Sequence, residues 1–76
     1  MALLIYYKQV RENPNEVEYQ FGETRETLDR TLTIDKVNNT PHTAQAEDVI
    51  FRSAAGQILL RAKREKQWPS NGVIAS

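Results

Sequence analysis

The chain has 76 residues and no cysteine, and its ten basic side chains balance ten acidic ones. This length allows one hydrophobic core, so we expect a single domain over residues 1–76, with an apolar C-terminal tail at 68–76. The absence of cysteine excludes disulfides and favours the cytoplasm, while no apolar stretch approaches the length of a membrane span.

Charge is unevenly distributed along the chain. Residues 1–48 carry five basic and nine acidic side chains, whereas residues 49–76 carry five basic side chains and one acidic side chain. The zero net charge argues against a strongly basic nucleic-acid-binding protein. The sequence nevertheless has an acidic part and a basic part.

Strand patterns occupy the first half of the chain. Residues 2–10 are rich in β-branched and aromatic side chains on both faces, and residues 16–23 alternate apolar with polar side chains. The turn-forming Asn13-Pro14-Asn15 between them predicts an antiparallel hairpin. A third strand is predicted over residues 31–37, after a capped turn or bulged loop that begins at Thr24.

A helix is predicted in the second half. Loop signals cluster at residues 38–42, Thr43 is a suitable N-cap, and apolar residues from 44 to about 66 repeat at helical spacing. Trp68-Pro69 ends the helix. Gly56 within it either permits close approach to the sheet or has no special role.

These elements predict an α+β fold, in which a three-stranded antiparallel sheet in the order β-β-β is followed by one long C-terminal helix packed on one face. The predicted inward side chains come from alternate strand positions and from one stripe of the helix. They are Ile5, Tyr7, Val17, Tyr19, Phe21, Leu32 and Ile34 on the sheet, and Ile50, Phe51, Ala54, Ile58 and Ala62 on the helix.

No catalytic signature is present, so the sequence does not indicate an enzyme, a cofactor or a metal. His42 is the single histidine, and beside Glu47 and Asp48 it is best explained as a solvated loop residue. Glu16 and Glu18 share one side of a strand at a spacing known for paired catalytic carboxylates. The polar face of an amphipathic strand explains them better.

Some apolar side chains are left over by this fold. Leu4 and Tyr6 point away from the helix, and Val49 and Leu60 lie opposite its packing stripe. Together with Trp68, just past the helix, they form the predicted interaction surface. We therefore expect an interaction or regulatory module whose partner is another protein or a second copy of the chain.

The alternative function is nucleic-acid binding by the basic end of the helix. Arg61, Lys63, Arg64 and Lys66 precede Trp68, and cations beside an aromatic ring suit phosphate and base. The helix dipole alone also favours cations at this end. Protein binding is therefore the first hypothesis and nucleic-acid binding the second, with no membrane partner.

The tail after Pro69 has two alternatives. Val73 and Ile74 form a short β-prone pair after Asn71-Gly72, so the tail can turn back over Leu60 or over the face of Leu4 and Tyr6. Otherwise the same residues meet a second subunit. A small core gains from association, which favours the dimer.

Two segments, Glu16-Val17-Glu18-Tyr19-Gln20-Phe21-Gly22 and the closing residues 68–76, carry a resemblance to known proteins. Together they resemble a group of small actinobacterial proteins of unknown function. The resemblance implies no activity, cofactor or partner.

Overall fold

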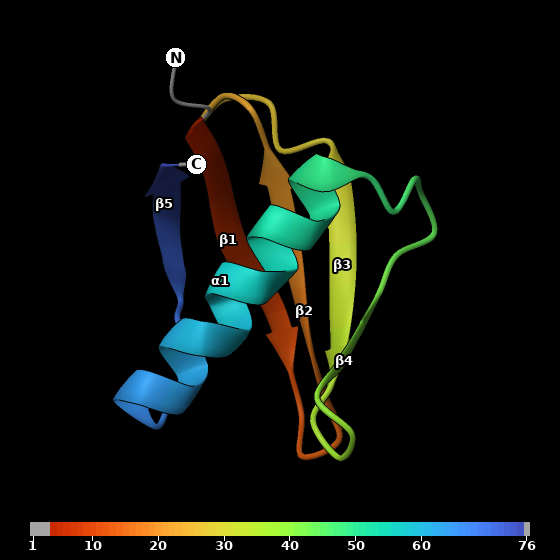
Figure 1. Ribbon diagram of the computed structural model, residues 1–76, viewed down its shortest axis with the longest axis vertical. Helices are drawn as coiled ribbons and strands as arrows, with labels where there is room; N and C mark the ends of the chain where they lie inside the picture. Colours follow the sequence, from red (N-terminus) through yellow and green to blue (C-terminus); the bar gives the residue numbers. More distant parts are fainter. Residues whose placement is uncertain (1–3, 76) are drawn as a thin grey trace.

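The computed structural model describes residues 4–75, which form a five-stranded antiparallel sheet crossed on one face by a single helix (Figure 1). The strands lie in the order β4-β3-β2-β1-β5. The elements are β1 Leu4–Glu12, β2 Glu16–Gly22, β3 Arg30–Asp35, β4 Thr40–His42, α1 Val49–Glu65 and β5 Asn71–Ala75.

The α+β class and the antiparallel sheet are confirmed, but the prediction of three strands is wrong. Residues 38–42 do contain a turn, in which Asn39 adopts a φ of 53°, yet this turn closes a hairpin between β3 and β4. Pro41 lies within β4, which its place at the sheet edge allows. The fifth strand is formed by the C-terminal tail.

The first hairpin is confirmed with small shifts of its ends. The Asn13 side chain accepts hydrogen bonds from the backbone of Asn15 and Glu16, at 2.8 and 2.9 Å, and so closes the turn. The register shifts between Gln9 and Arg11. Residues 2 and 3 of the predicted first strand lie outside the described residues.

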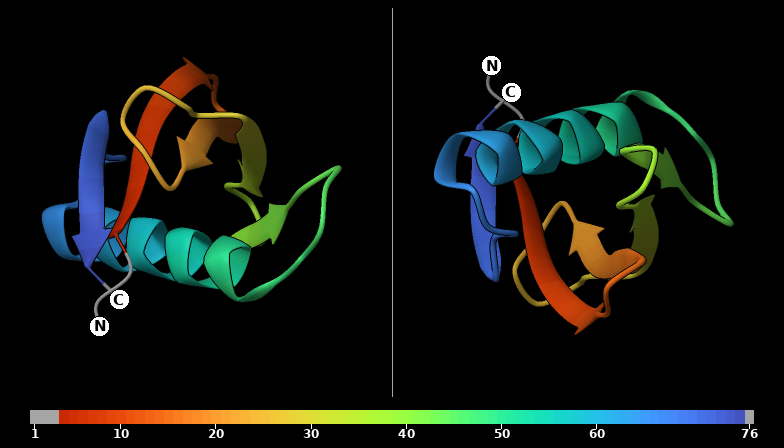
Figure 2. Two further views of the ribbon diagram at one scale, coloured as in Figure 1. Left: turned by 90° about the horizontal axis from the view of Figure 1, so that it is seen from above. Right: turned by 90° about the horizontal axis from the view of Figure 1, so that it is seen from below.

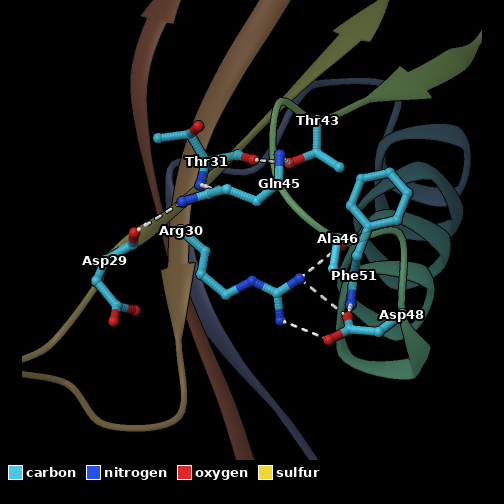
Figure 3. Close-up of polar contacts among 8 residues, drawn as sticks. All are labelled: Asp29, Arg30, Thr31, Thr43, Gln45, Ala46, Asp48 and Phe51. Atoms are coloured by element: carbon cyan, nitrogen blue, oxygen red, sulfur yellow. Dashed lines mark hydrogen bonds and ion pairs between the residues drawn. The ribbon is translucent and has the colours of Figure 1, made fainter.

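The helix begins at Val49, five residues later than predicted, with Asp48 as its N-cap in place of Thr43. The reason is that residues 43–48 bind the edge of β3 (Figure 3). Thr43 donates its hydroxyl to the Thr31 carbonyl at 2.7 Å. The Gln45 amide accepts from the Thr31 backbone N–H at 2.9 Å, so it completes the edge of β3 where β4 does not reach.

Asp48 then joins this segment to the helix. Its carboxylate accepts from the Phe51 backbone N–H at 3.0 Å and from both terminal nitrogens of Arg30, at 2.9 and 3.2 Å. Arg30 also donates to the Ala46 carbonyl at 2.7 Å (Figure 3). The hydrogen bonds that the Asp48 carboxylate accepts, first from Arg30 and then from Phe51, hold the pKa of Asp48 below its usual range.

One hydrophobic core lies between α1 and the sheet, and it contains the predicted inward residues of all three predicted strands. Figure 2 shows α1 lying across this face from the β3 side to the β5 side. Of the two alternatives for Gly56, close approach to the sheet is wrong, because a Cβ atom there would meet nothing within 4 Å. It lies on the open side of the helix and permits no close approach to the sheet.

The tail is part of the fold. After the αL residue Lys66, the Pro69 carbonyl accepts from the Tyr19 hydroxyl and the Ser70 carbonyl accepts from the Gln9 backbone N–H, each at 2.7 Å. β5 then pairs with β1, and Ile74 is buried in the core. Within residues 4–75, no helix combines the length and apolarity that a bilayer crossing requires.

Phe51→Ala should lower the free energy of unfolding by about 3–5 kcal/mol, because the ring is 4% exposed and its loss leaves a cavity under α1. This is close to the whole stability expected of so small a core. Chemical denaturation measures it. Gly56→Ala on the open side of the same helix is the control, and it should raise stability by roughly 0.5–1 kcal/mol. Equal effects of the two substitutions would contradict this packing.

Stability should also fall at high pH through Tyr19. Burial raises the pKa of Tyr19 to about 12, whereas an unfolded tyrosine ionises near pH 10. The contribution of Tyr19 to the free energy of unfolding is therefore complete below about pH 10. It is lost as the pH rises from about 10 to about 12, by roughly 1.4 kcal/mol per pH unit. Denaturation of wild type and Tyr19→Phe at pH 8 to 12 measures the difference. A difference that stays constant over this range would disprove the assignment.

Candidate functional site

The face of the sheet opposite α1 is divided into a polar part and an apolar part. The outward positions of β2 and β3 carry Glu16, Glu18 and Gln20, and Thr31, Thr33 and Asp35. On β1 and β5, Leu4 lies opposite Ala75 and Tyr6 lies opposite Val73. We call Leu4, Tyr6, Val73 and Ala75 the outer strip. Leu4 is 43% exposed and Val73 is 41% exposed.

A loop formed by residues 23–29 folds back over one side of the outer strip. It passes so close to Gly22 that a Cβ atom there would lie 2.0 Å from the Thr27 carbonyl oxygen, so this position requires glycine. Thr24 closes the turn within the loop by accepting from the Thr27 backbone N–H at 3.1 Å. The Arg25 guanidinium lies 5.4 Å from the centre of the Tyr6 ring. Tyr6 is therefore half-buried, while Leu4 and Val73 stay open.

Between this loop and strands β1 and β5 lies an open hollow of about 400 Å³. Its lining combines the apolar side chains of the strip with two cations, and no acidic residue contributes to it. The lining includes Tyr6, Lys8, Arg25, Leu28, Asn71 and Val73. Among residues 4–75, neither Lys8 nor Arg25 forms an ion pair.

The five residues of the predicted interaction surface do not form one surface. Leu4 and Tyr6 belong to the outer strip, whereas Val49 and Leu60 lie on α1, well apart along the helix, and are 66% and 51% exposed. Trp68 packs against the core at the end of the helix. Only the first two share a surface.

Arg61, a predicted nucleic-acid contact, binds the tail of its own chain. Its guanidinium donates to the Tyr7 hydroxyl at 2.7 Å and to the Val73 carbonyl at 3.1 Å. A Cβ atom at Gly72 would lie 2.6 Å from the Tyr7 hydroxyl and 2.8 Å from Arg61, so a larger residue would push these groups away. The tail is therefore fastened to the helix by a charged hydrogen bond donor.

The Val73 carbonyl points toward the free edge of the sheet. Along two antiparallel strands, pairs that exchange backbone hydrogen bonds alternate with pairs that do not. The hydrogen bond from the Gln9 N–H to the Ser70 carbonyl sets this alternation, so Val73 forms no backbone hydrogen bond with its partner Tyr6. Arg61 thus binds the carbonyl that a further strand would use. This edge is blocked at its centre.

Of the other predicted basic contacts, Lys63 and Lys66 line a groove beside Trp68, while Arg64 is exposed and lies 3.9 Å from Glu65.

The paired glutamates of β2 are bound by a cation. Glu16 and Glu18 form ion pairs with Arg11 at 2.8 and 3.1 Å, and the hydrogen bond to Glu16, above all, raises the pKa of Arg11.

His42 is exposed on β4, and within residues 4–75 no three His, Cys, Asp or Glu side chains gather where they could hold a metal ion.

Comparison of the chain with protein families, with curated proteins and with solved structures finds no match. The site must therefore be interpreted from its own residues.

Sequence reasoning missed the tail's contribution to the outer strip and the contribution of the 23–29 loop to the hollow. The sequence marks Val73 as β-prone, but its position beside Tyr6 depends on the pairing of β5 with β1. Lys8, Arg25 and Leu28 are separated by up to 20 positions along the chain, and no spacing rule links them. Gly22 was the one available signal, because a glycine at a strand end marks close approach of another segment.

Arg61→Ala should loosen β5 and lower the free energy of unfolding by about 1–2 kcal/mol, because Tyr7 and Val73 lose a charged donor. Amide hydrogen exchange should show faster exchange in residues 71–75 than elsewhere in the sheet. Arg64→Ala, an exposed cation three residues further along α1, is the control and should change stability by less than about 0.5 kcal/mol. Unchanged protection of β5 in Arg61→Ala would show that the tail does not depend on this contact.

Proposed function

We propose that this protein is a small interaction module that binds a second copy of itself through the outer strip. The observation that carries the proposal is the division of the sheet face, which is apolar along the outer strip of β1 and β5 and polar on β2 and β3. An exposed apolar patch with a polar rim is typical of a protein-binding surface.

The charges around the strip suit a symmetric contact. Lys8 and Arg25 border it on one side, and the 23–29 loop also carries Glu23 and Glu26. In a twofold arrangement the same surface serves both subunits, so it must present both signs of charge to itself. A standard interface covers about 800 Å² per partner, so the contact would extend from the strip onto this loop.

The edges of the sheet are poor places for association, which also favours the face. Arg61 occupies the Val73 carbonyl at the centre of β5. The opposite edge, β4, is three residues long and contains Pro41, which cannot donate a backbone hydrogen bond. Face-to-face packing of two outer strips needs neither edge.

The folded tail affects the proposed dimer in two ways. β5 closes the edge of β1 and buries Ile74, so a partner is not needed to cover that side chain. The same pairing places Val73 beside Tyr6 on the outside and so enlarges the apolar surface. The tail therefore stabilises the single chain and contributes to the proposed contact.

Nucleic-acid binding is the alternative. Lys63, Arg64 and Lys66 are exposed, and the two lysines line a groove with Trp68, which favours this alternative. Arg61 is bound to Tyr7 and Val73, and the net charge of the chain is zero, so the field that would attract phosphate is weak. Self-association has more support from the geometry.

Sedimentation velocity from 1 µM to 1 mM tests the proposal. Wild type should dimerise within this range, and Val73→Lys should raise the dimer dissociation constant at least about 100-fold, because it places an unpaired cation in the contact. Leu60→Lys, a similarly exposed apolar residue on α1, is the matched control and should dimerise like wild type. Unfolding curves should show that both variants are folded.

Three outcomes would overturn the proposal. Wild type could remain a monomer at every concentration, Val73→Lys could dimerise as well as wild type, or Leu60→Lys alone could abolish the dimer. The last result would assign the contact to the open side of α1.

A further inference from the structure

A second concave surface lies on the helix side of the molecule, apart from the outer strip. It is an open groove of about 570 Å³ between the last turns of α1, Trp68 and the β3–β4 turn. We call it the Trp68 groove. Its lining residues are Asn39, Leu59, Ala62, Lys63, Lys66, Gln67 and Trp68.

The wall of the groove is fixed by contacts on both sides of Trp68. The chain turns at Lys66, which has a φ of 59°, and the next residue after Trp68 is held by the hydrogen bond from Tyr19 to the Pro69 carbonyl. The Lys36 ammonium lies 5.9 Å from the centre of the indole ring and is itself bound to Glu12 at 2.6 Å. The groove therefore exists before any partner binds, which lowers the entropic cost of binding.

The charge of the groove is positive and uncompensated. Lys63 and Lys66 both line it, no acidic residue does, and among residues 4–75 neither lysine forms an ion pair. Leu59, Ala62 and Trp68 supply an apolar floor between them. Cations around an apolar floor are complementary to carboxylates that flank an apolar side chain.

The geometry points to a binding site for an acidic peptide segment, in which an apolar side chain packs on Leu59 and Trp68 while flanking carboxylates pair with Lys63 and Lys66. The amides of Asn39 and Gln67 also line the groove, and an amide can both donate to and accept from a peptide backbone. This site is independent of the outer strip and of self-association.

A peptide fits these observations better than a nucleic acid does. Lys36, a further cation near Trp68, does not line the groove and is paired with Glu12, so it adds no charge to the site. Arg61 is held by the tail, so two lysines supply the charge of the groove lining. Two cations match two carboxylates but give little attraction for a phosphate backbone.

Selection from a phage-displayed library of random ten-residue peptides tests the site. Peptides selected on the wild-type protein should carry two or more Asp or Glu residues next to Leu, Ile, Phe or Met. Trp68 is the single tryptophan of the chain, so its fluorescence should change as a selected peptide binds. The same titration with a decathymidine oligonucleotide should give weaker binding.

Lys63→Glu should weaken the selected peptides about tenfold, because it replaces an attraction with a repulsion. Arg52→Glu is the matched control, since it makes the same charge change at an exposed cation of α1 outside the groove, and it should bind like wild type. Val73→Lys should also bind like wild type, which separates this site from the outer strip. Unfolding curves should show that each variant is folded.

The proposal is overturned if the selected peptides show no acidic enrichment, if Lys63→Glu leaves their affinity unchanged, or if the Trp68 fluorescence does not respond. Tighter binding of decathymidine than of any peptide would assign the groove to nucleic acid instead.

Discussion

The position of α1 over the sheet is the constraint on which the other features depend, and Asp48 fixes where this helix begins. Its carboxylate caps the helix and binds Arg30 at the start of β3, so the first turn is tied to one side of the sheet. A helix of 17 residues starting there reaches the other side of the sheet at Lys66. The turn at Lys66, the seat of Trp68 and the pairing of β5 with β1 all follow from that end point. An exposed ion pair such as Arg30–Asp48 adds little to stability, but its geometry sets the start of α1 and so the strand that the tail can reach.

The core was predictable because strand and helix periods differ. Val17, Tyr19 and Phe21 alternate with polar residues, and Phe51, Ala54 and Ile58 repeat at helical spacing, so local pattern alone separates the inward from the outward side chains. The helix start was not predictable in this way. Thr43 and Asp48 are both good N-caps, and the choice between them depends on long-range hydrogen bonds, from Thr31 to Gln45 and from Arg30 to Asp48. The two extra strands were missed because β4 is three residues long and β5 is identifiable only by its partner.

The candidate surfaces were predictable only where one element supplies them. Leu4 and Tyr6 alternate with Ile5 on a single strand, so the period of two places them together on the face opposite Ile5. The Trp68 groove combines the helix end with Asn39 from the β3–β4 turn, which lies 20 positions away from Leu59 along the chain. In the sequence, only charge distinguishes Lys63 and Lys66, because their apolar neighbour Trp68 is placed by the turn at Lys66. The role of Arg61 depended likewise on where the tail lies.

The pairing of the last described strand with the first has a consequence for how the chain folds. Ile5 lies beside Ile74, 69 positions further along the chain, so this ladder closes a long loop whose closure entropy is lost before the contacts form. The β1–β2 and β2–β3 hairpins join neighbouring segments and can form early. The joining of β5 must wait for α1, because Arg61 and the turn at Lys66 hold the tail in place. Until then β1 is an unpaired edge with Tyr7 uncovered on its inner side. A chain with its hairpins and helix but without its final strand would therefore expose β1 as an edge, and an unpaired edge favours misassembly.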